Sequence, residues 1–308
     1  MSDVAIGLFA GLTTALLSSL SYLVSRHHSL SSGGSRLRLL GLSHALMAGV
    51  SLPLAILLCP EHLPPLASYF LPLIASAGFY LLGQCALALL LRRSDASRIA
   101  PLLGLKIVML AGITSFLLGE PLDSWQWAAV GLGTVAGLAL QTGAGGIAWR
   151  ELPLVLLTCL TFSLSDLAIV ALIKALVVPV EGFPPLSRIH AGGLAMTITY
   201  AACGAVALPL VACYRPRHRG DWIAAGQYAA AWLGSMAALY ICFGQIGVVF
   251  GNILQSTRGF MSVVLGAMLA HLGWHELEQR VDRATLLKRM AAAALMTAAI
   301  ALYAIDLR

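Results

Sequence analysis

Long runs of apolar residues, broken by short polar stretches, follow one another along almost the whole chain. Ten of these runs approach or exceed the roughly 20 residues that a helix needs to cross the hydrocarbon core of a bilayer. They cover residues 4–24, 39–59, 66–91, 98–119, 125–142, 152–178, 191–213, 221–243, 246–271 and 285–305. Little of the chain is left for a domain outside the membrane. The pattern predicts an all-α polytopic membrane protein with ten transmembrane helices.

Composition supports this class. Of the 308 residues, 59% are hydrophobic and only 10% are charged, whereas about a quarter of the residues of a soluble protein carry charge. The first apolar run begins at Val4 with no basic stretch before it and no small-residue cleavage site after it, so we expect a retained span rather than a signal peptide. We therefore expect an integral protein of a bacterial cytoplasmic membrane.

The distribution of Lys and Arg predicts the orientation. Fourteen of the 19 basic residues follow the first, third, fifth, seventh and ninth runs, two lie on the opposite side, and three lie within the runs themselves. Because short cytoplasmic loops collect positive charge, both termini are predicted to lie outside the cytoplasm. This placement also accounts for the formal charge of +6, so no nucleic-acid partner is expected.

Short motifs recur in the two halves of the chain in the same order. Leu-Pro-Leu surrounds Pro53 and Pro209, and Ser-Leu-Ser occupies 19–21 and 163–165. The offsets between such matches range from 144 to 161. They suggest two five-helix repeats, residues 1–148 and 149–308. Since five is odd, the second repeat is inverted relative to the first, and the shared site is expected near the middle of the membrane.

Two basic residues fall within apolar runs at membrane depth, Lys106 in the fourth run and Arg258 in the ninth. Insertion scales put the cost of a charged side chain at this depth at about 3 kcal/mol, so such residues usually face a cavity or a partner. Their offset of 152 lies within the range of the repeat without being fixed by it. The structural alternative is that each cation snorkels or pairs with a buried acid.

Asp166 lies in the middle of the sixth run and has several candidate roles: proton carrier, cation ligand, or counter-ion of Lys106 or Arg258. Asn252 and Gln255 precede Arg258 at spacings of three and share a helix face with it. Other polar and aromatic side chains are candidates for the substrate pocket, although each could instead bond helix backbone or sit at an interface. These candidates are Tyr22, Tyr80, Gln84, Ser165, Tyr228 and Trp232.

Three stretches around the fourth and fifth runs form a recognisable set. Residues 95–101 (Asp-Ala-Ser-Arg-Ile-Ala-Pro) enter the fourth run, and residues 116–122 (Phe-Leu-Leu-Gly-Glu-Pro-Leu) close it. Residues 125–131 (Trp-Gln-Trp-Ala-Ala-Val-Gly) begin the fifth. Together they resemble the drug/metabolite transporter superfamily, in its ten-helix form with two EamA units. The second half is less faithful, since residues 269–276 replace a clean Gly-Glu.

The resemblance implies a secondary transporter whose central cavity opens alternately to each side. Within the superfamily, triose-phosphate translocators carry basic residues on helices 4 and 9 that bind phosphate, and this placement would make Lys106 and Arg258 anion ligands. We therefore expect transport of a small polar, anionic metabolite bearing phosphate or carboxylate. The alternatives are proton-coupled export of amino acids or drug-like cations through Asp166, and flipping of a phosphate-bearing lipid carrier.

Other kinds of chemistry find little support. The chain has no phosphate-binding loop, no dinucleotide-binding motif and no Ser-His-Asp set, so neither an enzyme nor a cofactor is expected. No metal site is expected either, because residues 275–279 (His-Glu-Leu-Glu-Gln) lack the second histidine of HExxH. GxxxG pairs at Gly7/Gly11 and Gly133/Gly137 favour close helix packing and leave a homodimer open.

Overall fold

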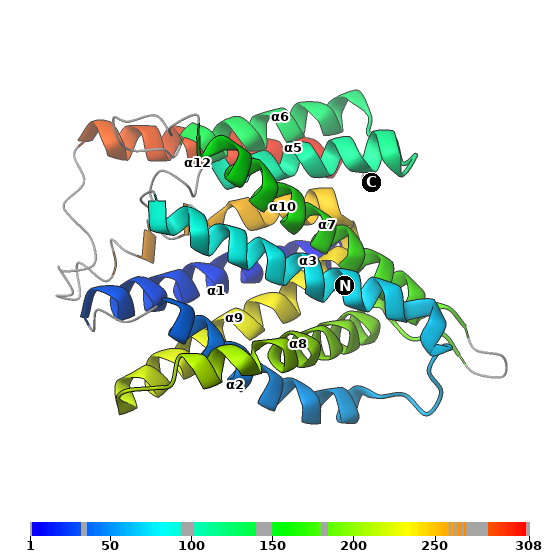
Figure 1. Ribbon diagram of the computed structural model, residues 1–308. Helices are drawn as coiled ribbons and strands as arrows, with labels where there is room; N and C mark the ends of the chain where they lie inside the picture. Colours follow the sequence, from blue (N-terminus) through cyan, green and yellow to red (C-terminus); the bar gives the residue numbers. More distant parts are fainter. Residues whose placement is uncertain are drawn as a thin grey trace.

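A computed structural model describes residues 2–31, 36–93, 102–139, 150–179, 184–258, 260–261, 264–265, 268 and 283–305. All regular secondary structure in these residues is helical, as predicted (Figure 1). The long helices are α1 (Asp3–Ser31), α2 (Arg36–Leu58), α3 (Leu66–Arg93), α6 (Ser124–Ala139), α7 (Leu152–Val177), α8 (Arg188–Cys213), α9 (Arg219–Ile246) and α12 (Arg283–Ile305). The shorter elements are η1 (Leu102–Gly104), α5 (Leu105–Gly112), η2 (Ile113–Leu117) and α10 (Val248–Ser256).

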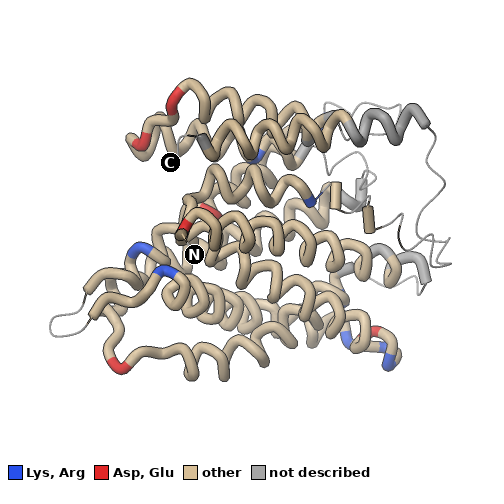
Figure 2. The backbone as a smooth tube through the Cα atoms, turned by 180° about the vertical axis from the view of Figure 1, so that it is seen from behind, with Lys and Arg blue, Asp and Glu red and all other residues tan. Residues whose placement is uncertain are grey.

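Six of these helices are long and apolar enough to cross a membrane: α1, α2, α3, α7, α8 and α9. Two further apolar segments are shorter, Leu105–Leu117 and Ala291–Ala304. Large apolar side chains such as Ile56 and Phe116 are exposed on the outside of the bundle, where only lipid would favour them. Most of the charged positions in Figure 2 lie near helix ends, and few lie within the long helices. These features define an integral membrane protein.

Each of the ten predicted runs overlaps at least one described helix, but the fourth run is not a regular α-helix and the ninth begins at a break in the chain direction. The fourth run consists of η1, α5 and the π-helical turn η2, in which Leu118 N–H donates to the carbonyl of Ile113. The chain leaves α9 for α10 at Gly247, whose φ of 81° is left-handed and favours glycine. The ends of the predicted runs at 98–101, 140–142 and 269–271 lie outside the described residues.

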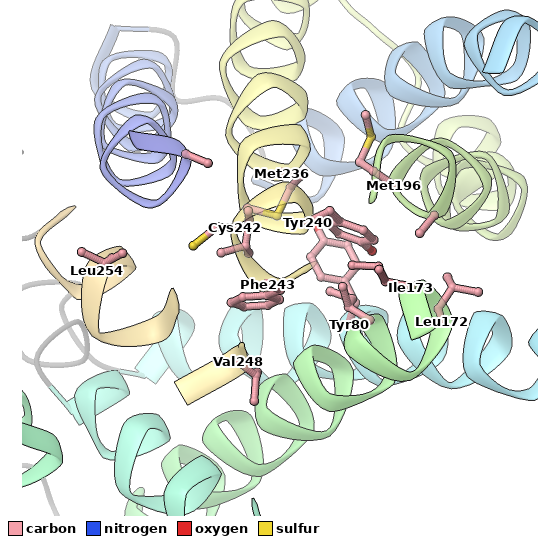
Figure 3. Packing of buried hydrophobic residues seen from close by; sticks show 14 of the residues in the cluster. Tyr80, Leu172, Ile173, Met196, Met236, Tyr240, Cys242, Phe243, Val248 and Leu254 are labelled. Atoms are coloured by element: carbon pink, nitrogen blue, oxygen red, sulfur yellow. The ribbon is translucent and has the colours of Figure 1, made fainter. Parts of the chain in front are cut away.

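The bundle is built mainly by pairs of helices from the two halves of the chain. The extensive pairs are α1 with α9, α3 with α7, α2 with α8, and α6 with α12. Side chains from α3, α7, α8, α9 and α10 then meet in a common core around Tyr240 and Phe243 (Figure 3). The core is therefore built from segments that are far apart in the sequence.

Glycine sets the closeness of two of these pairs. A Cβ on Gly204 of α8 would lie 2.1 Å from Ala48 Cβ of α2, so only glycine lets these helices approach. The GxxxG residues Gly7 and Gly11 likewise face Ile246 and Leu254 inside the chain. These two glycines are therefore used within the chain, and the sequence argument for a dimer contact at this face is removed.

Candidate functional site

A cavity lies in the middle of the bundle, lined by residues of α1, α3, η1, α5, α7, α8, α9 and α10 together with Arg258. The empty space between its walls, counting the part open to solvent, is about 800 Å³. Ten of the eleven candidate site residues line this one cavity: Tyr22, Tyr80, Gln84, Lys106, Ser165, Asp166, Tyr228, Trp232, Gln255 and Arg258. Asn252, the eleventh, is not among the lining residues, but its side chain donates a hydrogen bond to Asp166, which is.

Lys106 and Asp166 form an ion pair at one wall of this cavity. Lys106 Nζ of α5 lies 2.5 Å from Asp166 Oδ2 of α7. Asn252 of α10 donates from Nδ2 to the same carboxylate oxygen at 2.7 Å, and its amide also donates to the carbonyl of Val248. Asp166 is only 5% exposed. Of the roles that the sequence left open, the structure therefore shows Asp166 as the counter-ion of Lys106, joined to a helix of each half.

Arg258 has different surroundings. Its Nη1 donates to the hydroxyl of Tyr22 at 3.4 Å, and its guanidinium carbon lies 5.6 Å from the centre of the Tyr22 ring, a cation–π distance. No carboxylate among the described residues lies within ion-pair distance of it. A partly exposed guanidinium in a cavity, with a phenol as its neighbour, keeps donors for the oxygens of an anion.

Two serines hold the backbone beside these cations. Ser19 Oγ of α1 shares its proton between the carbonyl oxygens of Ala15, at 2.7 Å, and Arg258, at 2.9 Å. Ser163 Oγ of α7 donates to the carbonyl oxygen of Lys106 at 3.4 Å. Ser19 and Ser163 are the equivalent residues of the Ser-Leu-Ser motif, 144 positions apart. Lys106 and Arg258 therefore have matching surroundings in the two halves, which the sequence offset left open.

Aromatic rings cover much of the remaining wall. Trp232 stacks on Tyr228 with ring centres 5.8 Å apart, and Tyr22 and Trp232 form a T-shaped pair with ring centres 6.1 Å apart. Trp232 Nε1 donates to the hydroxyl of Tyr200 at 2.9 Å. Tyr200 itself was not among the predicted site residues. Its position in the middle of the seventh run would have been the only signal, and it is shared with many membrane tyrosines.

His44 is a second residue that sequence reasoning missed. It is buried in α2 and its Nδ1 lies 2.8 Å from the carbonyl of Leu40, which can only accept. In the neutral ring Nε2 then accepts from the Tyr80 hydroxyl, 3.1 Å away. His44 thus orients Tyr80 from behind the cavity wall. An ionisable residue in the middle of an apolar run was the available signal, the same one that singled out Lys106.

Other charged groups lie at the helix ends. Asp221 at the start of α9 is buried near His28 and Arg38, at 3.7 and 3.6 Å, and accepts from the backbone of Arg217 and His218. This cluster ties together the ends of α1, α2 and α9. Lys174 pairs with Glu120 at 3.2 Å in an exposed position.

A metal centre has no support in the described residues, which contain no group of three potential ligands. The His-Glu stretch at 275–279 lies outside them, as do residues 95–101 and 269–276. The six cysteines form no disulfide.

An apolar helical bundle around a polar, charged cavity is an arrangement found in membrane transporters. Residues 5–142 match the model of the EamA-like transporter family, which is part of the drug/metabolite transporter superfamily. The match confirms, for these residues, the resemblance seen in the sequence. No curated protein matches the chain.

The fold itself is also found among solved structures. One, described only as "Crystal structure of protein", is 16% identical and aligns with a TM-score of 0.66. The alignment covers 97% of this chain and 98% of that chain. This similarity concerns the fold alone, and it extends over both halves of the chain.

Proposed function

We propose that the protein is a secondary active transporter that moves a small, anionic metabolite, bearing phosphate or carboxylate, by alternating access through the central cavity. Arg258 is the main support, because it is a cation in the cavity with no carboxylate partner among the described residues. Gln255 also lines the cavity and offers a further amide to the substrate. The aromatic rings would contact the rest of the molecule.

The proposal includes two inverted five-helix repeats, residues 1–148 and 149–308. Numbering the helical segments one to ten, α1 with α9 is the pair 1–8 and α3 with α7 is the pair 3–6. Adding five to each number, or subtracting it, converts one pair into the other. The pairs α2 with α8 and α6 with α12 convert into themselves. This exchange is what a two-fold axis between inverted repeats would produce.

The predicted orientation of the loops also indicates which side of the membrane the cavity faces. Leu87, Leu103 and Cys159 line the cavity near the end of α3 and the starts of η1 and α7. The loops beyond these three points are predicted to be cytoplasmic. We propose that substrate exchanges with the cytoplasm in this conformation, and that rocking of one repeat against the other opens the opposite side.

Ligand-dependent thermal stability tests the anion proposal, because a ligand that binds only the folded state stabilises it by about 2.7 kcal/mol at 100 times its Kd. The purified protein is heated in detergent with phosphorylated, carboxylated, zwitterionic and cationic metabolites. We expect anions to raise the melting temperature of the wild type and of Lys174→Ala, which removes a cation outside the cavity. Arg258→Ala should lose the response.

Stabilisation by cations or zwitterions alone, with Arg258→Ala responding like the wild type, would overturn the proposal. The anion that stabilises the protein is then tested as a substrate by counterflow into proteoliposomes. Uptake of labelled anion driven only by unlabelled anion inside the vesicles is expected for the wild type and not for Arg258→Ala.

A further inference from the structure

We infer that Asp166 determines the charge of the substrate, restricting the cavity to anions with a single negative charge and excluding dianions such as phosphate monoesters. The inference rests on the proposed function and narrows it to metabolites with one negative charge, such as monocarboxylates and phosphodiesters. Asp166 does so by neutralising Lys106, so that Arg258 alone supplies the attraction.

The charge balance of the cavity is the first basis. Among the described residues that line it, the groups charged at neutral pH are Lys106, Asp166 and Arg258. Their charges add up to one positive charge. A monoanion beside Arg258 leaves the closed cavity neutral, whereas a dianion leaves an uncompensated negative charge in a region of low dielectric constant.

The geometry prevents a substrate from recruiting Lys106 as a second cation. The Lys106 and Asp166 side chains are only 14% and 8% exposed, and Nζ already lies within 2.5 Å of Oδ2. Asn252 holds that same oxygen in place. A dianion that took Lys106 would leave the Asp166 carboxylate buried without its cation and close to the new negative charge, which opposes binding.

A comparison of the two halves of the site shows that the neutralisation of Lys106 depends on the residue at one position. The serine that bonds the cation's carbonyl is Ser19 in the first half and Ser163 in the second. Three residues after each serine comes the side chain that contacts the cation: Tyr22 beside Arg258, and Asp166 beside Lys106. Equivalent positions therefore hold a neutral phenol in one half and a carboxylate in the other.

A pair of probes that differ in charge but hardly in shape tests the inference. At pH 8 phenyl sulfate is a monoanion and phenyl phosphate is a dianion, because the second proton of a phosphate ester leaves at a pKa of about 6. Their dissociation constants are measured from the change in tryptophan fluorescence of the protein, whose six tryptophans include Trp232 in the cavity wall. In the wild type we expect phenyl sulfate to bind more tightly than phenyl phosphate.

Asp166→Asn keeps the shape of the side chain and raises the charge of the cavity by one. We expect the ratio of phenyl phosphate to phenyl sulfate affinity to increase at least tenfold in this variant. Glu120→Gln, the matched control, makes the same change in charge at an exposed site outside the cavity and should leave the ratio unchanged. The double variant Lys106→Gln/Asp166→Asn restores the single positive charge, so its ratio should return to the wild-type value.

The outcomes separate the inference from the proposed function. If the wild type binds both probes equally, or binds neither, or if Asp166→Asn leaves the ratio unchanged, the inference is wrong while an anion response in the metabolite panel still supports anion transport. Failure of the whole anion panel overturns the proposed function itself. Should Asp166→Asn not fold, Tyr22→Asp places a carboxylate beside Arg258 and should abolish phenyl sulfate binding; retained binding would contradict the inference.

Discussion

Ser19 on α1 donates a hydrogen bond to the backbone carbonyl of Arg258, 239 residues further along the chain. Ser163 makes the equivalent bond to Lys106. Each bond links a helix of one half to the cation-bearing segment of the other, so the backbone beside each cation is held by the opposite half of the chain.

Removal of these hydroxyls should weaken the protein slightly and similarly in the two halves. Ser19→Ala and Ser163→Ala are each expected to cost about 0.6 kcal/mol, the average of hydrogen bonds between membrane helices. Ser18→Ala is the control, since its buried hydroxyl bonds only Ala15 of its own helix. Thermal unfolding in detergent measures the difference. Serine variants as stable as Ser18→Ala would show that the bonds between halves contribute nothing.

The ion pair of Lys106 and Asp166 should show strong coupling in a double-mutant cycle. Lys106→Ala is expected to lose about 1–3 kcal/mol, because it leaves a carboxylate with little access to water; the open cavity keeps this below the 3–5 kcal/mol of a fully enclosed pair. Lys106→Ala/Asp166→Asn should recover most of the loss, because it leaves no unpaired charge. Additive losses, measured by thermal unfolding, would mean that the two residues do not interact.

Gly204 should tolerate no side chain. A Cβ there would meet Ala48 Cβ at 2.1 Å and the carbonyl of His44 at 2.8 Å, so Gly204→Ala must separate α8 from α2. We expect a loss of about 1–3 kcal/mol, typical of overpacking. Gly193→Ala, in the same helix, is the control because its Cβ would lie 3.5 Å from Leu58, an ordinary contact. Equal melting temperatures for the two variants would contradict the observed packing.

The orientation can be tested with two native cysteines. Cys59 follows α2 and Cys213 ends α8, and both are exposed. The positive charges predict that Cys59 lies outside and Cys213 in the cytoplasm. In single-cysteine variants, a membrane-impermeant maleimide should label Cys59 in intact cells and Cys213 only after permeabilisation. The reverse labelling pattern would mean that the orientation is opposite to the predicted one. Equal labelling of both cysteines in intact cells would mean that the protein does not have a single orientation.

Much of the site was predictable from sequence because a polar side chain is costly inside the membrane unless it faces a partner or a cavity. Charged side chains within apolar runs are unfavourable against lipid, so those of Lys106, Arg258 and Asp166 face the interior of the bundle and line one cavity. Tyr80 and Gln84 followed from the same reasoning. Tyr200 and His44 were not predicted, since a single aromatic residue or histidine in an apolar run has many structural explanations.

The sequence by itself determined the positions of the helices and the residues that avoid lipid, because the thickness of the bilayer and the cost of a buried charge act on any chain. Only the tertiary structure decided which charges meet. Asp166 lies beside Lys106 and not Arg258 because of how α5, α7 and α10 pack against one another. Packing also directs Gly7 and Gly11 towards the chain's own helices. Such contacts depend on side-chain shapes brought together from distant segments, and no local pattern specifies them.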